Sequence, residues 1–162
     1  MSCHPRTESK PSSRFLLVQT GSTFPELRAR RGDFPDWFRR GLGLRRNEVD
    51  VVRVDAGEAL PEHATTHAGV IVTGSPAMVS ERLRWSEDTA AWLRTTIDKG
   101  TAVLGVCYGH QLLAHALGGR VDYHPRGREV GPVGIDRLAA AADDALLPPS
   151  PPRFLAPPPP PQ

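Results

Sequence analysis

The sequence predicts an α/β fold in which a doubly wound, mostly parallel sheet is covered by helices on both faces. Short apolar runs, typical of buried strands, alternate along the chain with amphipathic segments of helical period. Successive runs are separated by enough residues for the crossover connections that parallel strands require. One apolar run leads through a glycine-flanked cysteine directly into a helical segment, a connection typical of the carboxyl edge of such sheets.

Four segments are expected to be strands because they are short and rich in β-branched and aliphatic residues. In chain order they are Arg14–Gln19, Val49–Val54, Ala68–Thr73 and Thr101–Leu104. The last is almost wholly apolar, as is typical of a parallel strand that is buried on both faces. We therefore expect its side chains to be enclosed.

Three segments have the apolar spacing of amphipathic helices. They are Asp33–Leu44, Ser86–Lys99 and Gln111–Leu117. Aspartate is a common helix cap and proline is tolerated in a first turn, so Asp33 and Pro35 mark the start of the first helix. The expected buried residues of the second helix are Ala90, Leu93 and Ile97. The third helix is expected to end at Gly118 and Gly119.

The composition favours a cytoplasmic globular protein over a fibrous, secreted or membrane protein. Of the 162 residues, 39% are hydrophobic and 23% are charged, and the two cysteines, Cys3 and Cys107, do not suggest a disulfide framework. No segment has the apolar length of a signal peptide or a bilayer span. The net charge is +2 and arginines alternate with acidic residues, so we expect neither a nucleic-acid nor a membrane partner.

The segment Gly105-Val106-Cys107-Tyr108-Gly109-His110-Gln111 has the pattern of a nucleophile elbow. A nucleophile on a tight turn between strand and helix leaves little space for neighbouring Cβ atoms, which is the role expected of Gly105 and Gly109. The N-terminus of the following helix carries partial positive charge and favours the thiolate of Cys107. The alternative is a structural cysteine that fills space between strand and helix, but that explains neither glycine.

A second small-residue segment, Thr73-Gly74-Ser75-Pro76, follows the third strand and is expected at the same edge of the sheet as Cys107. Its small residues permit a sharp turn that presents backbone N–H groups. An N–H of Gly74 or Ser75, together with that of Tyr108, is a candidate oxyanion hole for a carbonyl group under attack. The alternative is an ordinary tight turn, which Gly-Ser-Pro also forms.

Together these two segments resemble the class I glutamine amidotransferases, especially stand-alone proteins similar to the glutaminase domain of GMP synthetase. The resemblance covers about Phe15 to Ile135. It implies that Cys107 attacks the side-chain amide of glutamine, that ammonia leaves, and that water then hydrolyses a glutamyl thioester. It also implies an oxyanion hole made by Tyr108 and the Gly74–Ser75 loop, and a position for Gln111 beside the bound glutamine. It implies no cofactor or metal and does not identify an ammonia acceptor.

The C-terminal part departs from the family pattern. Family members carry a catalytic histidine with a glutamate two residues later, and no His-x-Glu follows Gln111 in this sequence. The segment Pro148–Gln162 is rich in proline and is expected to form neither a strand nor a regular helix. We therefore expect a partial domain at residues 14–138, truncated or altered at its C-terminus, between disordered tails at residues 1–13 and 139–162.

The other histidines offer one candidate replacement. His124 follows a predicted strand beyond the elbow helix, although a solvent-exposed turn histidine is the alternative. His63 and His67 precede the third strand and are expected at the opposite edge of the sheet from the cysteine. His115 is expected to pack or to face solvent, and His110 to support the elbow.

A hairpin is expected after the elbow helix, with strands at Arg120–Tyr123 and Val130–Ile135, beside the active-site edge. Family members have a similar Arg-Gly-Arg-Glu run between these strands. The resemblance therefore makes Arg126, Arg128 and Glu129 candidates for holding the carboxylate or amine of glutamine. An ordinary charged turn is the alternative.

Three classes of function stay open. The first is a glutaminase or amidotransferase that acts on glutamine or a γ-glutamyl compound. The second is a catalytically inactive domain that at most binds glutamine or another partner, and the missing His-Glu pair favours it for this polypeptide. The third is a different cysteine-elbow hydrolase or stress protein of the same broad fold, which the family-type elbow disfavours.

Overall fold

The computed structural model describes residues 14–123, 132–139, 141, 144, 151 and 153–156. The chain divides into two units, Met1–Asp122 and Tyr123–Gln162. The N-terminal segment 1–13, His124, Arg126, Arg128, Glu129 and most of the proline-rich segment lie outside the described residues. The expectations for these positions, and the domain boundaries at residues 14 and 138, stay predictions.

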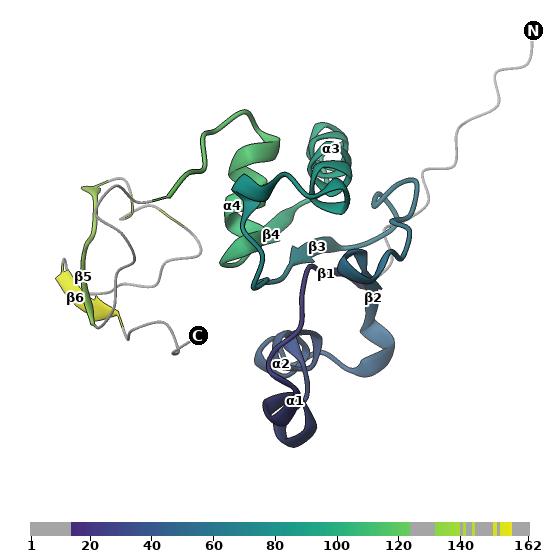
Figure 1. The fold of residues 1–162 in the computed structure, drawn as a ribbon, viewed down its shortest axis with the longest axis horizontal. Coiled ribbons are helices and arrows are strands. Elements are labelled where there is room, and N and C mark those ends of the chain that lie inside the picture. Colours follow the sequence, from purple (N-terminus) through teal and green to yellow (C-terminus); the bar gives the residue numbers. More distant parts are fainter. Residues whose placement is uncertain are drawn as a thin grey trace, which may run out of the picture. The chain divides into compact units, whose positions relative to one another are not determined.

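The first unit is built on a parallel sheet of four strands (Figure 1). The strands are β1 (Phe15–Gln19), β2 (Val49–Arg53), β3 (Gly69–Val72) and β4 (Val103–Gly105). They lie in the order β2-β1-β3-β4, and every pair is parallel. A first strand flanked by the second and the third is the order of a doubly wound sheet, so the predicted fold class is confirmed.

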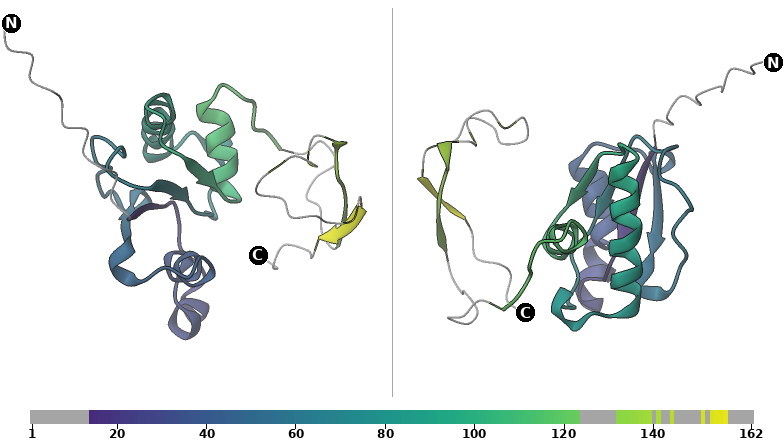
Figure 2. Two further views of the ribbon diagram at one scale, coloured as in Figure 1. Left: turned by 180° about the vertical axis from the view of Figure 1, so that it is seen from behind. Right: turned by 90° about the horizontal axis from the view of Figure 1, so that it is seen from above.

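Helices cover both faces of this sheet. They are α1 (Pro25–Arg31), α2 (Phe34–Gly41), α3 (Arg84–Asp98) and α4 (Tyr108–Ala116), with short 3-10 helices η1 (Arg46–Glu48), η2 (Val54–Ala56) and η3 (Val79–Glu81). Helices α3 and α4 lie on one face, and α1 and α2 lie on the other (Figures 1 and 2). None of the helices in the described residues has the length and apolar character that a membrane span requires.

Successive side chains of each strand point to opposite faces of the sheet, so the core has two parts. Leu16, Val18 and Val70 belong to the larger cluster, which includes buried residues of α3 and α4. Leu17 and Ile71 belong to a smaller cluster on the opposite face, against which Phe38 of α2 packs. On α3 the buried residues are Ser86, Thr89, Ala90, Leu93 and Thr96, whereas Ile97, predicted to be buried, is only half-buried.

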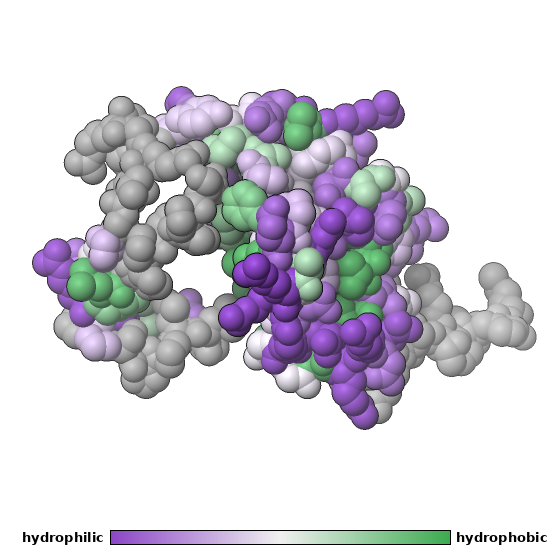
Figure 3. Space-filling model, turned by 60° about the horizontal axis from the view of Figure 1, so that its bottom comes forward, coloured by the Kyte–Doolittle hydropathy of each residue, from purple (hydrophilic) through white to green (hydrophobic). Residues whose placement is uncertain are grey.

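The prediction that the fourth strand is enclosed on both faces is wrong. Leu104 is 40% exposed, although its register partner Ile71 in β3 is buried. Strand β4 is the last in the order of the sheet, and α2 contacts β1 instead. Figure 3, in which the face carrying α1 and α2 comes forward, shows hydrophobic residues interrupting the hydrophilic surface.

Helix α1 was not predicted. Pro25 occupies its first turn with Glu26, and basic residues occupy its last turn, all of which are favourable at those positions. However, no residue of α1 is buried, so the helix has no apolar stripe. Without such a stripe the sequence shows no helical period of apolar residues.

The second unit contains an antiparallel pair, β5 (Val133–Asp136) and β6 (Arg153–Ala156), in which Ile135 is opposite Phe154. Two expectations are therefore wrong. Residues 120–123 form no strand, because no described strand offers their backbone groups a hydrogen-bonded partner. The proline-rich segment contains β6, because Arg153–Ala156 has no proline and retains the N–H donors that pairing needs.

The N-terminus of α2 confirms the predicted cap. The Asp33 carboxylate accepts hydrogen bonds from the N–H groups of Phe34 and Thr23, each at 2.9 Å. The Asp33 N–H donates to Asp36 at 3.1 Å, which completes a capping box. Burial raises the pKa of the Asp33 carboxyl, but hydrogen bonds from Thr23, Phe34, Ser22 and Gln19 outweigh burial and hold the pKa below 3.8.

We expect Asp33→Ala to lower the free energy of unfolding by about 1–2 kcal/mol at neutral pH, because the first turn of α2 loses its cap. Since folding lowers the pKa of Asp33, its stabilisation is full above the unfolded pKa of about 3.9 and is lost as pH falls through the folded pKa. Urea unfolding at several pH values should therefore show the difference from wild type narrowing below about pH 4. Substituting the exposed Asp98, at the C-terminal end of α3, by alanine is the matched control and should cost nothing.

Candidate active site

The turn between β4 and α4 has the geometry of a strained elbow. Cys107 has φ 55° and ψ −113°, a region that non-glycine residues rarely occupy. The N–H of Val106 bonds to the carbonyl of Val72 at 3.0 Å, which extends the β3–β4 ladder up to the turn. The N–H of Gly109 bonds to the carbonyl of Thr73 at 3.0 Å and ties the first turn of α4 to the end of β3. These hydrogen bonds, before and after Cys107, stabilise its strained backbone conformation. Such conformations are typical of functional positions.

Both flanking glycines are required for this turn. A Cβ atom at Gly105 would lie 2.5 Å from the carbonyl oxygen of Gly109. A Cβ atom at Gly109 would lie 2.3 Å from the carbonyl oxygen of Val72. These contacts are with backbone atoms, which cannot move aside cheaply. The predicted role of the two glycines is therefore confirmed.

Tyr108, the residue after the cysteine, is locked against α3. Its ring is 1% exposed and lies 5.7 Å from the ring of Trp85. Its hydroxyl is 2.6 Å from the Ser86 hydroxyl. Burial raises the pKa of the Tyr108 phenol above 10.0, so the side chain is neutral at physiological pH and acts here as an anchor. The first residue of α4 thus has a rigid position.

The Cys107 thiol is exposed. The alternative expectation, a cysteine buried as filler between strand and helix, does not hold. The thiol stands at the N-cap of α4, where unpaired N–H groups and the helix dipole provide partial positive charge. Gln111 lies one turn further along α4 and is half-buried, and its N–H bonds to the Cys107 carbonyl at 3.1 Å.

The loop after β3 lies directly against the cysteine. A Cβ atom placed on Gly74 would lie 3.6 Å from the Cβ of Cys107 and 3.9 Å from its Sγ. The Ser75 hydroxyl accepts a hydrogen bond from the N–H of Ala77 at 3.1 Å, which closes the turn. Within residues 14–123 no hydrogen-bond partner is found for the backbone N–H groups of Gly74, Ser75 and Tyr108. The structure thus brings together the two segments that the sequence analysis paired.

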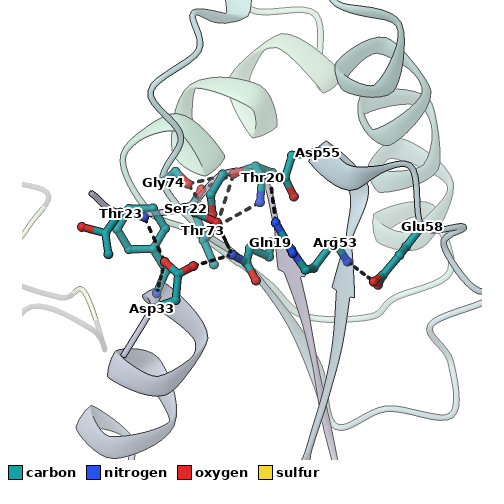
Figure 4. Close-up of polar contacts among 12 residues, drawn as sticks. Gln19, Thr20, Ser22, Thr23, Asp33, Arg53, Asp55, Glu58, Thr73 and Gly74 are labelled. Carbon is teal, nitrogen blue, oxygen red and sulfur yellow. Dashed lines mark hydrogen bonds and ion pairs between the residues drawn. The ribbon is translucent and has the colours of Figure 1, made fainter. Parts of the chain in front are cut away.

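A polar network beneath this loop escaped the sequence analysis (Figure 4). Thr20, at the end of β1, bonds to both Thr73 and Gly74 at the end of β3. Gln19 donates to the Gly21 carbonyl, to Ser22 and to Asp33, and so ties the loop after β1 to the cap of α2. This network could have been predicted from the two threonines that directly follow the first and third strands. The carboxyl ends of neighbouring parallel strands lie at one edge of the sheet, so residues that follow them lie close together.

The described histidines are remote from the thiol or make no polar contact near it. His63 lies 2.6 Å from Lys99 and His67 lies 3.3 Å from Asp50, at the amino edge of the sheet, as predicted. His115 packs against Glu87 at 3.1 Å and lies eight residues beyond Cys107, which is ~12 Å along a helix. His110 is exposed and makes no hydrogen bond with the described residues, and its expected support of the elbow stays a prediction. Among the described residues no group of three acidic, His or Cys side chains is arranged to hold a metal ion.

Comparisons with known proteins agree with this geometry. The family model of glutamine amidotransferase class-I matches residues 33–142. The chain is 37% identical over 124 residues to a glutamine-hydrolysing GMP synthase of Aeropyrum pernix, covering 76% of this chain and 21% of that protein. It is 34% identical over 138 residues to the corresponding protein of Thermomicrobium roseum, covering 84% of this chain and 22% of that protein. The chain therefore spans about a fifth of the length of these relatives.

A solved structure shows the same fold. A glutamine amidotransferase of Methylobacillus flagellatus aligns with a TM-score of 0.58 and 27% identity over 75% of this chain and 45% of that one. The matching family model covers the elbow, the loop after β3 and helices α2, α3 and α4. The chain thus belongs to the class-I glutamine amidotransferase family.

Proposed function

We propose that this chain binds glutamine, or a related γ-glutamyl compound, and attacks its side-chain amide with the Cys107 thiolate. The observation that carries the proposal is the exposed thiol, held at φ 55° on the N-terminus of α4 and in contact with the loop after β3. A strained, accessible nucleophile at a helix N-terminus is typical of covalent catalysis. A free thiol stays reduced in the cytoplasm, which is the compartment that we propose for this chain.

The proposed reaction has two steps. Sulfur adds to the amide carbon, negative charge moves onto the carbonyl oxygen, and the nitrogen leaves as ammonia after it gains a proton. Water then cleaves the glutamyl thioester and restores the thiol, so the balance is glutamine plus water to glutamate plus ammonia. The first step needs a proton donor, and the second needs a base.

Three backbone N–H groups are available for the developing oxyanion. Those of Tyr108, Gly74 and Ser75 have no hydrogen-bond partner among the described residues and flank the elbow. Donors held in place before the reaction stabilise charge without reorganising, and one such donor is worth roughly 100-fold in rate. The half-buried Gln111, one turn into α4, is proposed to lie beside the bound glutamine.

A second function, binding of glutamine without efficient turnover, is favoured by the histidine positions. No histidine in residues 14–123 has a polar contact that places it beside the leaving nitrogen. In that case the pocket and the thiol are retained, but ammonia release and thioester cleavage are slow.

We expect a chloromethyl ketone analogue of glutamine to alkylate Cys107 rapidly and stoichiometrically, and free glutamine to protect the thiol. Peptide mass spectrometry measures the site and rate of modification. Cys3 is an internal control, since it is not part of the elbow motif, and Cys3→Ser should leave the labelling rate unchanged. Equal labelling of Cys3 and Cys107, or no protection by glutamine, would show that Cys107 is not part of a glutamine site.

A further inference from the structure

Two threonines meet beneath the loop that faces the cysteine. Thr20 follows β1 and Thr73 follows β3, and both are 0% exposed. The Thr20 hydroxyl lies 3.0 Å from the Thr73 carbonyl oxygen and 3.1 Å from the Gly74 carbonyl oxygen. The Thr73 hydroxyl accepts from the Thr20 N–H at 3.1 Å and donates to the Gly74 carbonyl at 3.1 Å. The Gly74 carbonyl is therefore within hydrogen-bond distance of hydroxyl groups from two strand ends.

The donors and acceptors in this cluster balance. Each hydroxyl has one proton. The Thr73 proton can go to the Gly74 carbonyl, and the Thr20 proton can go to the Thr73 or the Gly74 carbonyl. The two hydroxyl oxygens also lie 3.3 Å apart, where either can donate to the other. The Thr73 carbonyl also accepts the N–H of Gly109, from the first turn of α4. One connected set of bonds thus joins the end of β1, the loop after β3 and the elbow.

This arrangement determines which way the Gly74–Ser75 peptide faces. No cis peptide occurs among the described residues, and in a trans peptide the N–H points opposite to the C=O. Because the Gly74 carbonyl points to the threonines, the Ser75 N–H points away from them. A Cβ atom built on Gly74 would point toward Cys107, so this loop residue lies beside the cysteine.

The loop is also confined from the side of β1. A Cβ atom at Gly21 would lie 2.7 Å from the Pro76 ring and 2.9 Å from the Ser75 Cα. The loop after β3 is thus packed between the loop after β1 and the elbow. A peptide flip at Gly74 would break its bonds to the threonine hydroxyls and leave a hydroxyl donor of a fully buried threonine unpaired, which is unfavourable.

We infer that Thr20 and Thr73 are positioning residues that hold the Gly74–Ser75 peptide with its N–H toward the carbonyl oxygen of the substrate. This inference rests on the proposed function, because it assigns a purpose to the orientation of one donor of the oxyanion hole. Neither threonine touches the substrate. Their hydroxyls act through the peptide plane that they hold.

The test compares Thr20→Val with Thr20→Ser. Valine has nearly the shape of threonine without the hydroxyl, and serine keeps the hydroxyl. Thr73 is less suitable for the test, because its hydroxyl also accepts the buried Thr20 N–H, which would be left unpaired. The carbonyl carbon shift of Gly74 and the amide shift of Ser75, measured by NMR, report whether the hydrogen bond and the peptide orientation change.

Two electrophiles separate positioning from thiol reactivity. The glutamine chloromethyl ketone presents a carbonyl oxygen to the oxyanion hole, whereas iodoacetamide alkylates the thiol by displacing iodide and builds no oxyanion. We expect Thr20→Val to slow modification of Cys107 by the ketone roughly tenfold and to leave modification by iodoacetamide unchanged. Thr20→Ser should restore the ketone rate.

Each outcome decides between distinct conclusions. If Thr20→Val reacts with both reagents like the wild type, or its Gly74 and Ser75 shifts do not move, the positioning role is wrong while the proposed function stands. If both reagents slow equally, the threonine acts on the thiol or on stability, and the positioning role is again wrong. If the wild-type protein shows no preference for the glutamine ketone over iodoacetamide, the proposed function fails and this inference fails with it.

Discussion

Replacing Gly109 by alanine is expected to destabilise the protein by about 3 kcal/mol or more, enough to unfold a large fraction of a marginally stable domain. The added Cβ would lie 2.3 Å from the Val72 carbonyl oxygen and 2.8 Å from its carbon. These atoms belong to a central strand, and moving them disturbs the β3–β4 ladder and the hydrogen bond from Gly109 to Thr73. Denaturant unfolding followed by circular dichroism measures the loss.

Gly41→Ala is the matched control. Gly41 is the last residue of α2, and nothing lies within 4 Å of the position that its Cβ would occupy. Alanine is a better helix former than glycine, so this variant should match or exceed the wild type by up to about 1 kcal/mol. If Gly109→Ala were as stable as Gly41→Ala, the elbow would have space for a Cβ atom at residue 109. The close approach of α4 to β3 seen in the structure would then be contradicted.

The second large effect concerns turnover. We expect the 162-residue chain to release about one equivalent of ammonia from glutamine and then to continue slowly, and Cys107→Ala to reduce release to the background of buffer. The first equivalent reports formation of the thioester, and the slow phase reports the lack of a base beside it. A coupled ammonia assay measures both phases, and mass spectrometry of the intact protein detects the glutamyl adduct.

Two controls make this experiment decisive. Cys3→Ser should behave like the wild type, because the glycine-flanked elbow motif contains Cys107 and not Cys3. Added imidazole should speed the slow phase if a missing base limits it. Rapid, sustained release that depends on Cys107 would contradict the expectation and would return His124 to consideration as the base. Alkylation of Cys107 by the glutamine ketone without any first equivalent would support the binding function instead.

The elements that the sequence predicted well are those with a regular apolar pattern. The four strands of the parallel sheet and helices α2, α3 and α4 all lie within a few residues of their predicted ranges. Helix α1 was missed because it buries no side chain and therefore leaves no apolar period. The strand at Arg153–Ala156 was missed because the surrounding prolines conceal a short segment that still has every N–H donor.

The exposure of Leu104 was mispredicted for a different reason. An apolar run indicates that a strand is suited to burial, but not whether a neighbouring element covers it. The position of β4 at the end of the strand order is a property of topology, and it leaves one face of the strand open among the described residues. Local composition contains no information on that order.

The sequence by itself determined the elbow, because its requirements are local. Cys107, Gly105 and Gly109 lie within five residues, and a turn this tight admits only residues without Cβ atoms at its close contacts. Only the tertiary structure decided what faces the thiol. The residues around the thiol are far apart in the chain, at Thr20, Gly74 and Cys107. They meet because β1, β3 and β4 pair in parallel, which brings the carboxyl ends of these strands to one edge of the sheet. The register of this pairing is selected by side-chain packing.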